Sequence, residues 1–333
     1  MCFTLKNNTI AKKTKKKYNT FVVLTNVNYK HIKFILKRGN QLQNYVFITD
    51  SDSDLPYNIV DERKIEMIYM SYNINGEEFF DDLGRNQAHK KYYDDMRAGS
   101  VPRTTALPSN YFVEYFSTFL KEGKDILYLA FSSQLSANIF NVFMAKEELL
   151  AKYPDRKIIV VDTLSISYPQ AILVIMAHDL YKEGKSIEEV ANWVEENKLR
   201  SQAWFTVDDL KYLQRGGRIS AVSAVVGSLL NIKPIITESK EGKIVSIDKI
   251  KGRKKSLHYI AQKVADNLDE NVDPHLTIIH ADALDDANML AEKIKELVPT
   301  IEKIEFSFIG SVIGAHCGPG TVAACFFGKK RAN

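Results

Sequence analysis

Cysteine is scarce in this chain. Its 333 residues include Cys2, Cys317 and Cys325, and their spacings match neither a disulfide framework nor a zinc site. No apolar run approaches the roughly 18 residues that a membrane-spanning helix needs, so stable membrane insertion is not expected. Both observations favour a protein of the reducing cytoplasm.

The signatures of several enzyme classes are missing as well. The sequence has no nucleophile elbow, no Walker loop, no dinucleotide fingerprint and no metal-ligand spacing. It therefore predicts no cofactor and no recognisable reaction centre. A binding protein is favoured over an enzyme.

Positive charge is concentrated at the N-terminus. Ten of the 45 Lys and Arg residues lie in positions 1–44, which contain no acid, so the rest of the chain has 35 basic and 41 acidic residues. This mildly acidic body argues against a nucleic-acid-binding surface. Residues 1–44 are expected to be a basic extension outside the core. Polar residues interrupt the apolar positions after its lysines and no small-residue cleavage site follows, which disfavours a signal peptide.

Residues 45–185 alternate between apolar strands, polar strand ends and helices. Buried strands are predicted at 45–49, 125–131 and 157–161, and each is followed by Ser, Asp or Thr residues. This is the doubly wound α/β pattern, in which the polar residues after the strands share one edge of a parallel sheet. A β-like segment at 65–74 turns at Asn75-Gly76 and returns through 77–80.

The pattern changes after residue 185. Short strands are predicted at 203–207, 234–237, 243–249, 276–280, 303–308 and 322–327, with helices at about 253–268 and 284–297. Gly242 marks a hairpin, which indicates a mixed or antiparallel sheet. Residues 186–330 are therefore predicted to form a second domain of α+β type.

The stretch at 205–220, FTVDDLKYLQRGGRIS, combines a strand, a short helix and a glycine turn. Arg215 and Arg218 flank Gly216-Gly217, so a guanidinium could reach a phosphate or a carboxylate without obstruction by a bulky neighbour. A helix C-cap with solvated arginines explains the same residues equally well.

A few hydroxyls and one imidazole are the other candidate ligand groups. Ser136 follows a strand where a helix begins, Thr104 and Thr105 lie between two prolines, and His316 lies in the glycine-rich run 310–320. Structural N-capping would explain Ser136, and the glycines imply close backbone approach or positive φ. Hydroxyls with an imidazole suit the binding of a carboxylate better than chemistry on it.

One catalytic alternative remains. Asp50 and Asp52 follow a buried strand at the spacing of the nucleophile and acid/base of haloacid-dehalogenase-type Mg²⁺-dependent phosphatases. A lysine and a distal aspartate to complete that site cannot be assigned.

Taken in order, several motifs resemble those of the DegV family of bacterial fatty-acid-binding proteins. They are ITDSDSDL (48–55), PRTTALP (102–108), SSQLSANIF (132–140), DTLSIS (162–167), the stretch at 205–220, NIKPII (231–236), KGRKKSL (251–257) and GAHCGPG (314–320). The resemblance covers about residues 45–330. It implies a three-layer α/β/α domain and a second α+β domain, with a lipid tunnel between them.

The resemblance also implies a function without catalysis. The protein would hold a long-chain fatty acid and present its carboxylate to a separate ATP-dependent, dihydroxyacetone-kinase-like fatty acid kinase for phospholipid synthesis. By position, Thr105, Ser136 and His316 would contact the carboxylate, with Thr104 and Ser133 beside them. Arg215, Arg218 and Arg253 would serve kinase docking or phosphate handling. A sensor or scaffold filled with lipid is the remaining alternative.

The chain departs from the family pattern at several of these positions. Ala106 and Leu107 follow Thr105, Ala137 follows Ser136, and Pro169 and Ala171 stand where glycines are usual. These changes are expected to alter the shape of the tunnel, and with it the preferred acyl chain, more than the head-group contacts.

Overall fold

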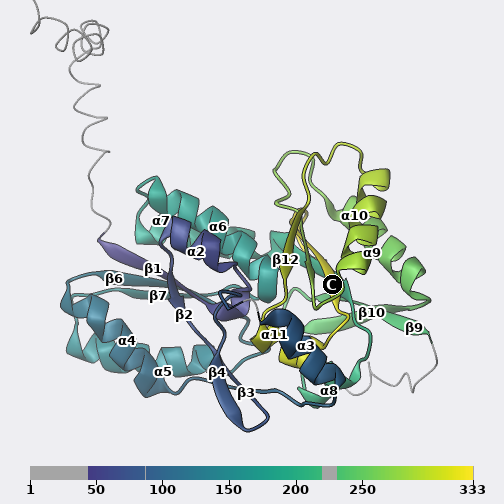
Figure 1. Cartoon of the computed structure of the whole chain (residues 1–333). Helices are drawn as coiled ribbons and strands as arrows, with labels where there is room; N and C mark the ends of the chain where they lie inside the picture. The colour runs from purple at the N-terminus through teal and green to yellow at the C-terminus, as the bar shows by residue number, and fades with distance from the viewer. Residues whose placement is uncertain (1–43, 87, 220–230, 333) are drawn as a thin grey trace, which may run out of the picture. The chain divides into compact units, whose positions relative to one another are not determined.

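The computed structural model describes residues 44–86, 88–219 and 231–332 (Figure 1). Within the chain, residues 44–333 form one compact unit. The basic extension predicted for 1–44 lies outside the described residues apart from Asn44, and so does Ser220, the last residue of the glycine-turn stretch.

A four-stranded parallel sheet is the first layer that the chain builds. Its strand order is β2-β1-β6-β7, and every neighbouring pair is parallel. The strands are β1 (Tyr45–Asp50), β2 (Glu66–Ile68), β6 (Asp125–Ala130) and β7 (Ile158–Asp162). The predicted doubly wound α/β pattern is therefore confirmed.

Helices cover both faces of this sheet because successive side chains of a strand point in opposite directions. Ile48 and Tyr128 pack with the helices of one face, whereas Phe47 and Leu129 pack with those of the other. The first face is covered by α4 (Ser109–Lys121) and α5 (Asn138–Lys152), the second by α6 (Ser167–Lys182) and α7 (Ile187–Asn197). Ser186 begins α7 with a capping box closed by Glu189, as expected from a serine in front of a helix.

The segment at 65–74 is not the single β element that the sequence suggested. It divides into β2, which stays in the parallel sheet, and β3 (Ser71–Ile74), which joins a separate antiparallel sheet of order β4-β3-β5. The outer strands of this small sheet are β4 (Glu77–Phe80) and β5 (Arg103–Thr105). The division falls at Met70, whose N–H donates 2.9 Å to Ser51 Oγ rather than continuing the β2 ladder.

The second half of the chain forms a six-stranded mixed sheet of order β10-β9-β8-β13-β11-β12, in which β11 and β12 are parallel and the other neighbours antiparallel. Its strands are β8 (Ser201–Thr206), β9 (Ile232–Glu238), β10 (Ile244–Lys251), β11 (Thr277–His280), β12 (Glu305–Phe308) and β13 (Val322–Phe327). Helices α9 (Arg253–Asn267) and α10 (Leu284–Leu297) cover one face. The predicted mixed sheet is confirmed, and a domain boundary near residue 185 stays a prediction.

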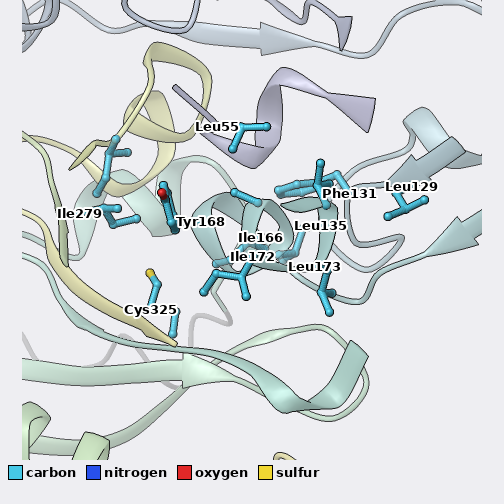
Figure 2. Packing of buried hydrophobic residues seen from close by; sticks show 14 of the residues in the cluster. Leu55, Leu129, Phe131, Leu135, Ile166, Tyr168, Ile172, Leu173, Ile279 and Cys325 are labelled. Atoms are coloured by element: carbon cyan, nitrogen blue, oxygen red, sulfur yellow. The ribbon is translucent and has the colours of Figure 1, made fainter. Parts of the chain in front are cut away.

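Helix α6 joins the two sheets into one core. Residues 167–174 at its start are all buried, and the helix contacts β1 of the first sheet and β8 and β13 of the second. Figure 2 shows Tyr168, Ile172 and Leu173 of this helix among side chains from both halves. In the part of the chain that the structure describes, no helix is long and apolar enough to cross a membrane.

Candidate functional site

A cavity lies between the two sheets. Its wall on the second sheet is apolar, because alternate residues of β8, β11 and β13 face inward. These residues are Ala203, Phe205, Ile279, Ala323 and Cys325. The opposite wall is formed by apolar residues at the ends of β6 and β7 and at the start of α6, including Phe131, Leu135, Ile166 and Pro169.

Polar groups from four separate segments reach the same cavity. Thr104 comes from β5, Ser136 from the turn before α5, Arg218 from the turn after α8 (Lys211–Arg215) and His316 from α11 (Ser311–Cys317). His316 Nε2 lies 2.9 Å from Thr104 Oγ1. The structure thus brings together hydroxyls and an imidazole that are up to 212 positions apart in the sequence.

The surroundings of His316 favour the neutral form of its imidazole. Burial, helped by Arg218 and Arg215, lowers its pKa to about 4, so the ring is neutral at physiological pH. Among the described residues its Nδ1 has no hydrogen-bond partner, and it faces Gly216, where a Cβ would lie 2.3 Å away. Gly216 therefore lets the turn approach the histidine.

The two neighbouring threonines point in different directions. Thr104 is half-buried and lines the cavity, whereas Thr105 is exposed and is not among the lining residues. The register of β5 on β3, in which Tyr72 pairs with Thr104 and Ser71 with Thr105, sets this alternation. Thr104, expected only as a neighbour of the carboxylate contacts, lies beside His316, and the contact of Thr105 with the carboxylate stays a prediction.

The remaining expected residues lie at varied positions. Ser133 is not among the residues that line the cavity, and its backbone N–H donates to Asp162 Oδ1. Arg215 is exposed and its guanidinium lies 5.2 Å from the ring centre of Tyr212. Arg253 is 16% exposed and binds Asp286 Oδ2 at 2.8 Å and the Gly320 carbonyl at 2.5 Å, so its hydrogen bonds link the starts of α9 and α10 to the loop before β13.

The glycine-rich run at 310–320 is partly helical, which the sequence did not indicate. Residues 311–317 form α11, and only Gly318 and Gly320 of this run have positive φ. Gly310 makes the expected close approach: a Cβ there would lie 2.6 Å from Asp54 Oδ1 and 2.7 Å from Asp81 Oδ2. The run is therefore a short helix set tightly against the first half of the chain.

Two buried carboxylates hold the start of α11. Asp54 accepts from the Gly310 N–H at 2.9 Å, and Asp81 accepts from the Val312 N–H at 3.3 Å. Burial raises the pKa of Asp81 to about 6 and that of Asp54 well above its ordinary value. These contacts fix the helix that carries His316. No local pattern in the sequence indicates them, because Asp54 and Asp81 are far from Gly310 and Val312 along the chain.

The surroundings of Asp50 differ from those that a phosphatase nucleophile needs, because its carboxylate is buried and already hydrogen-bonded. It is fully buried and accepts hydrogen bonds from the Tyr128 hydroxyl, the Phe131 N–H and the Gln170 amide at 2.7 to 3.1 Å. Burial raises its pKa to about 6. Among the described residues, no group of three or more His, Cys, Asp or Glu side chains is arranged to hold a metal ion. The geometry thus favours a structural Asp50.

Comparisons with known proteins agree with this architecture. The family profile described as "Uncharacterised protein, DegV family" matches residues 45–329. A DegV domain-containing protein of Clostridium perfringens is 42% identical over 290 residues, which are 87% of this chain and 99% of the relative.

Solved structures give the same result. A fatty acid binding DegV family protein from Streptococcus agalactiae has a TM-score of 0.76 and 28% identity, and the match covers 86% of this chain and 100% of that one. DegV of Bacillus subtilis, a fatty acid binding protein, has a TM-score of 0.72 and 27% identity over 86% of this chain and 100% of its own. The chain belongs to the DegV family.

Proposed function

We propose that this protein binds a long-chain fatty acid in the cavity between its two sheets, without catalysing a reaction. The observation that carries the proposal is the division of the cavity wall. Apolar residues from both halves of the chain make up most of it, and Thr104, Ser136, Arg218 and His316 are among its polar groups. Solved DegV proteins named for fatty acid binding add support.

The energetics suit such a ligand. Burial of an acyl chain contributes about 0.8 kcal/mol per methylene, or on the order of 10 kcal/mol for a long chain before ordering costs. The head group can then be held by modest contacts. Neutral hydrogen-bond donors such as the hydroxyl of Thr104 hold a carboxylate less tightly than a fully buried ion pair would, which leaves it available for transfer.

Removal of head-group contacts provides the first test. Ser136→Ala with His316→Ala removes two contacts worth about 1 kcal/mol each, so the Kd for palmitate is expected to rise roughly 30-fold. Mass spectrometry of organic extracts should find a fatty acid with wild-type protein and much less with the double variant. A wild type that carries no fatty acid and takes up none after delipidation would refute the proposal.

The threonine pair supplies a matched control. Thr104→Ala should weaken palmitate binding about fivefold, whereas Thr105→Ala, at the exposed neighbouring position, should leave the Kd unchanged. A larger effect of Thr105→Ala than of Thr104→Ala would mean that β5 presents its other face to the ligand.

We further propose that the bound acid is presented to a separate ATP-dependent fatty acid kinase, so that the acyl phosphate can enter phospholipid synthesis. Arg215 supports this part, because its exposed guanidinium lies beside Tyr212 on the helix that leads to the cavity residue Arg218. An exposed planar cation is suited to an acidic partner surface. Arg253 is a weaker candidate for docking since Asp286 already engages it.

Arg215→Ala is expected to slow kinase-dependent formation of acyl phosphate about tenfold without changing the fatty acid content. Lys254→Ala, which removes an exposed charge from α9, serves as the control and should have no effect. The measurement is the initial rate with a purified fatty acid kinase at several protein concentrations. Loss of fatty acid from the Arg215→Ala protein would instead assign this residue to ligand binding.

A further inference from the structure

The side chain of Asp52 places a buried carboxyl group in the lining of this cavity. Asp52 is 4% exposed and lines the same cavity as Thr104, Ser136 and His316. Its Oδ1 is buried and has no hydrogen-bond partner among residues 44–86, 88–219 and 231–332. Buried polar atoms in proteins nearly always have a partner. The unpaired oxygen of a carboxyl group that lines a cavity therefore indicates that a bound ligand supplies the missing hydrogen-bond partner.

The surroundings of Asp52 favour its neutral form. Burial raises its pKa well above the ordinary value, and the neighbouring carboxyls of Asp50, Asp81 and Asp54 raise it further, whereas Arg218 opposes the shift. The Tyr128 hydroxyl is a further titratable group near it, and burial likewise raises the pKa of that phenol. A protonated Asp52 has an O–H to donate.

The contacts of Arg218 leave its positive charge without a carboxylate partner in the described residues. Its Nε donates 3.0 Å to the Leu135 carbonyl, and its Nη1 donates to the Gly216 carbonyl. Both acceptors are neutral. The cavity thus offers one cation, one buried carboxyl and several neutral polar groups to an incoming ligand.

We propose that Asp52 is a further contact of the bound fatty acid, its carboxylic acid group donating a hydrogen bond to one carboxylate oxygen while Arg218 balances the charge. This inference rests on the proposed fatty acid binding and assigns a residue to that site. A hydrogen bond between an acid and a carboxylate is charge-assisted and strong. Two ionised carboxylates beside one arginine would instead repel each other.

The arrangement selects a class of head group. A site with an O–H from Asp52, hydroxyls from Thr104 and Ser136 and the guanidinium of Arg218 is rich in donors. A carboxylate offers acceptors only, and an alcohol or primary amide brings donors that compete with those of the wall. The proposal therefore includes preference for palmitate over hexadecanol and palmitamide.

The sign of the pH dependence follows from the proton on Asp52. A raised pKa means that the proton is bound at low pH and lost as the pH rises through the raised value. Palmitate is already ionised above pH 6, since aliphatic carboxyls titrate near 4 to 5, and the pKa of His316 lies at about 4. Affinity should therefore fall as the pH rises through the raised pKa of Asp52.

The test compares wild type, Asp52→Asn and Asp52→Leu by competition of palmitate with a fluorescent 16-carbon fatty acid at constant ionic strength. Wild type is expected to bind at least tenfold more weakly at pH 9 than at pH 6.5. Asp52→Asn keeps a donor that does not titrate, so its affinity should be nearly independent of pH. Asp52→Leu should bind about tenfold more weakly than wild type at pH 6.5.

Asp50, Asp54 and Asp81 also have raised pKa values and are present in all three proteins, so a pH slope that persists in Asp52→Asn would belong to them. The nearly isosteric Asp52→Asn variant keeps the test decisive if Asp52→Leu does not fold. Binding by wild type with a flat pH profile, or the same pH slope in Asp52→Asn, would overturn the role of Asp52 alone. No binding of palmitate by wild type at any pH would overturn the proposed function as well.

Discussion

Cys325→Phe protein is expected to lose affinity for palmitate more than 100-fold while it still binds a ten-carbon acid. Cys325 is fully buried on β13, lines the cavity and pairs across the sheet with Ala203. Figure 2 shows it beside the buried side chains of the core. A phenyl ring at this position displaces roughly four methylenes of an acyl chain, or about 3 kcal/mol of burial.

The small side chains on this wall are what make the effect large. The cavity face of β8 and β13 carries Ala203, Ala323 and Cys325 as neighbours. Because these side chains are short and cannot move aside, an aromatic ring at position 325 would fill space that the acyl chain needs. Cys325→Ala is the matched control and should bind palmitate within about twofold of wild type. Isothermal titration with acids of 8 to 18 carbons gives the length profile. An unchanged profile for Cys325→Phe would mean that the chain does not reach β13.

Much of this site follows from local sequence patterns. The apolar runs that become β1, β6 and β7 predict a parallel sheet, and the polar residues after them do share one edge. The Ser132 N–H donates to the Ser165 carbonyl, and the Ser133 N–H donates to Asp162. Parallel strands all end at the same side, so this meeting of strand ends needs no knowledge of side-chain packing.

Other features depend on contacts that no local pattern contains. Thr104 rather than Thr105 reaches the cavity because of the register of β5 on β3, and a shift by one residue would reverse the two. Residues 311–317 become helical although glycines flank them, because Asp54 and Asp81 bind the first N–H groups of α11. Tertiary packing overrides the low helix propensity of glycine there.

The pairing of Glu238 with Arg331 is the clearest case of a contact hidden from the sequence. The two residues lie at the end of β9 and near the C-terminus, and their side chains are 0% and 1% exposed. Arg331 Nη1 lies 3.6 Å from Glu238 Oε2 and donates 2.9 Å to the Leu164 carbonyl. Glu238 also accepts from the Ile166 and Ala203 N–H groups, so it connects α6 to β8.

Arg331→Met is therefore expected to destabilise the fold by about 3–5 kcal/mol at pH 9, with a fall in Tm on the order of 10 °C. Burial raises the pKa of Glu238 to about 7 even with Arg331 present, and loss of the guanidinium raises it further. Because the folded state holds this proton more strongly than the unfolded state, stability is lost as pH rises through the raised pKa. The destabilisation should accordingly be smaller at pH 6 than at pH 9.

Thermal unfolding at both pH values, with Lys330→Met as the control at the exposed neighbouring position, measures this effect. Adding Glu238→Gln to Arg331→Met should recover part of the loss at pH 9, since glutamine carries no charge and its carbonyl oxygen still accepts from one of the two N–H groups. Equal losses at both pH values, with no recovery in the double variant, would show that Arg331 acts through its carbonyl contacts and packing alone. A larger loss at pH 9, with recovery in the double variant, would establish that the charge of Arg331 stabilises the junction between α6 and the second sheet. This junction lies next to the cavity wall that would receive the acyl chain.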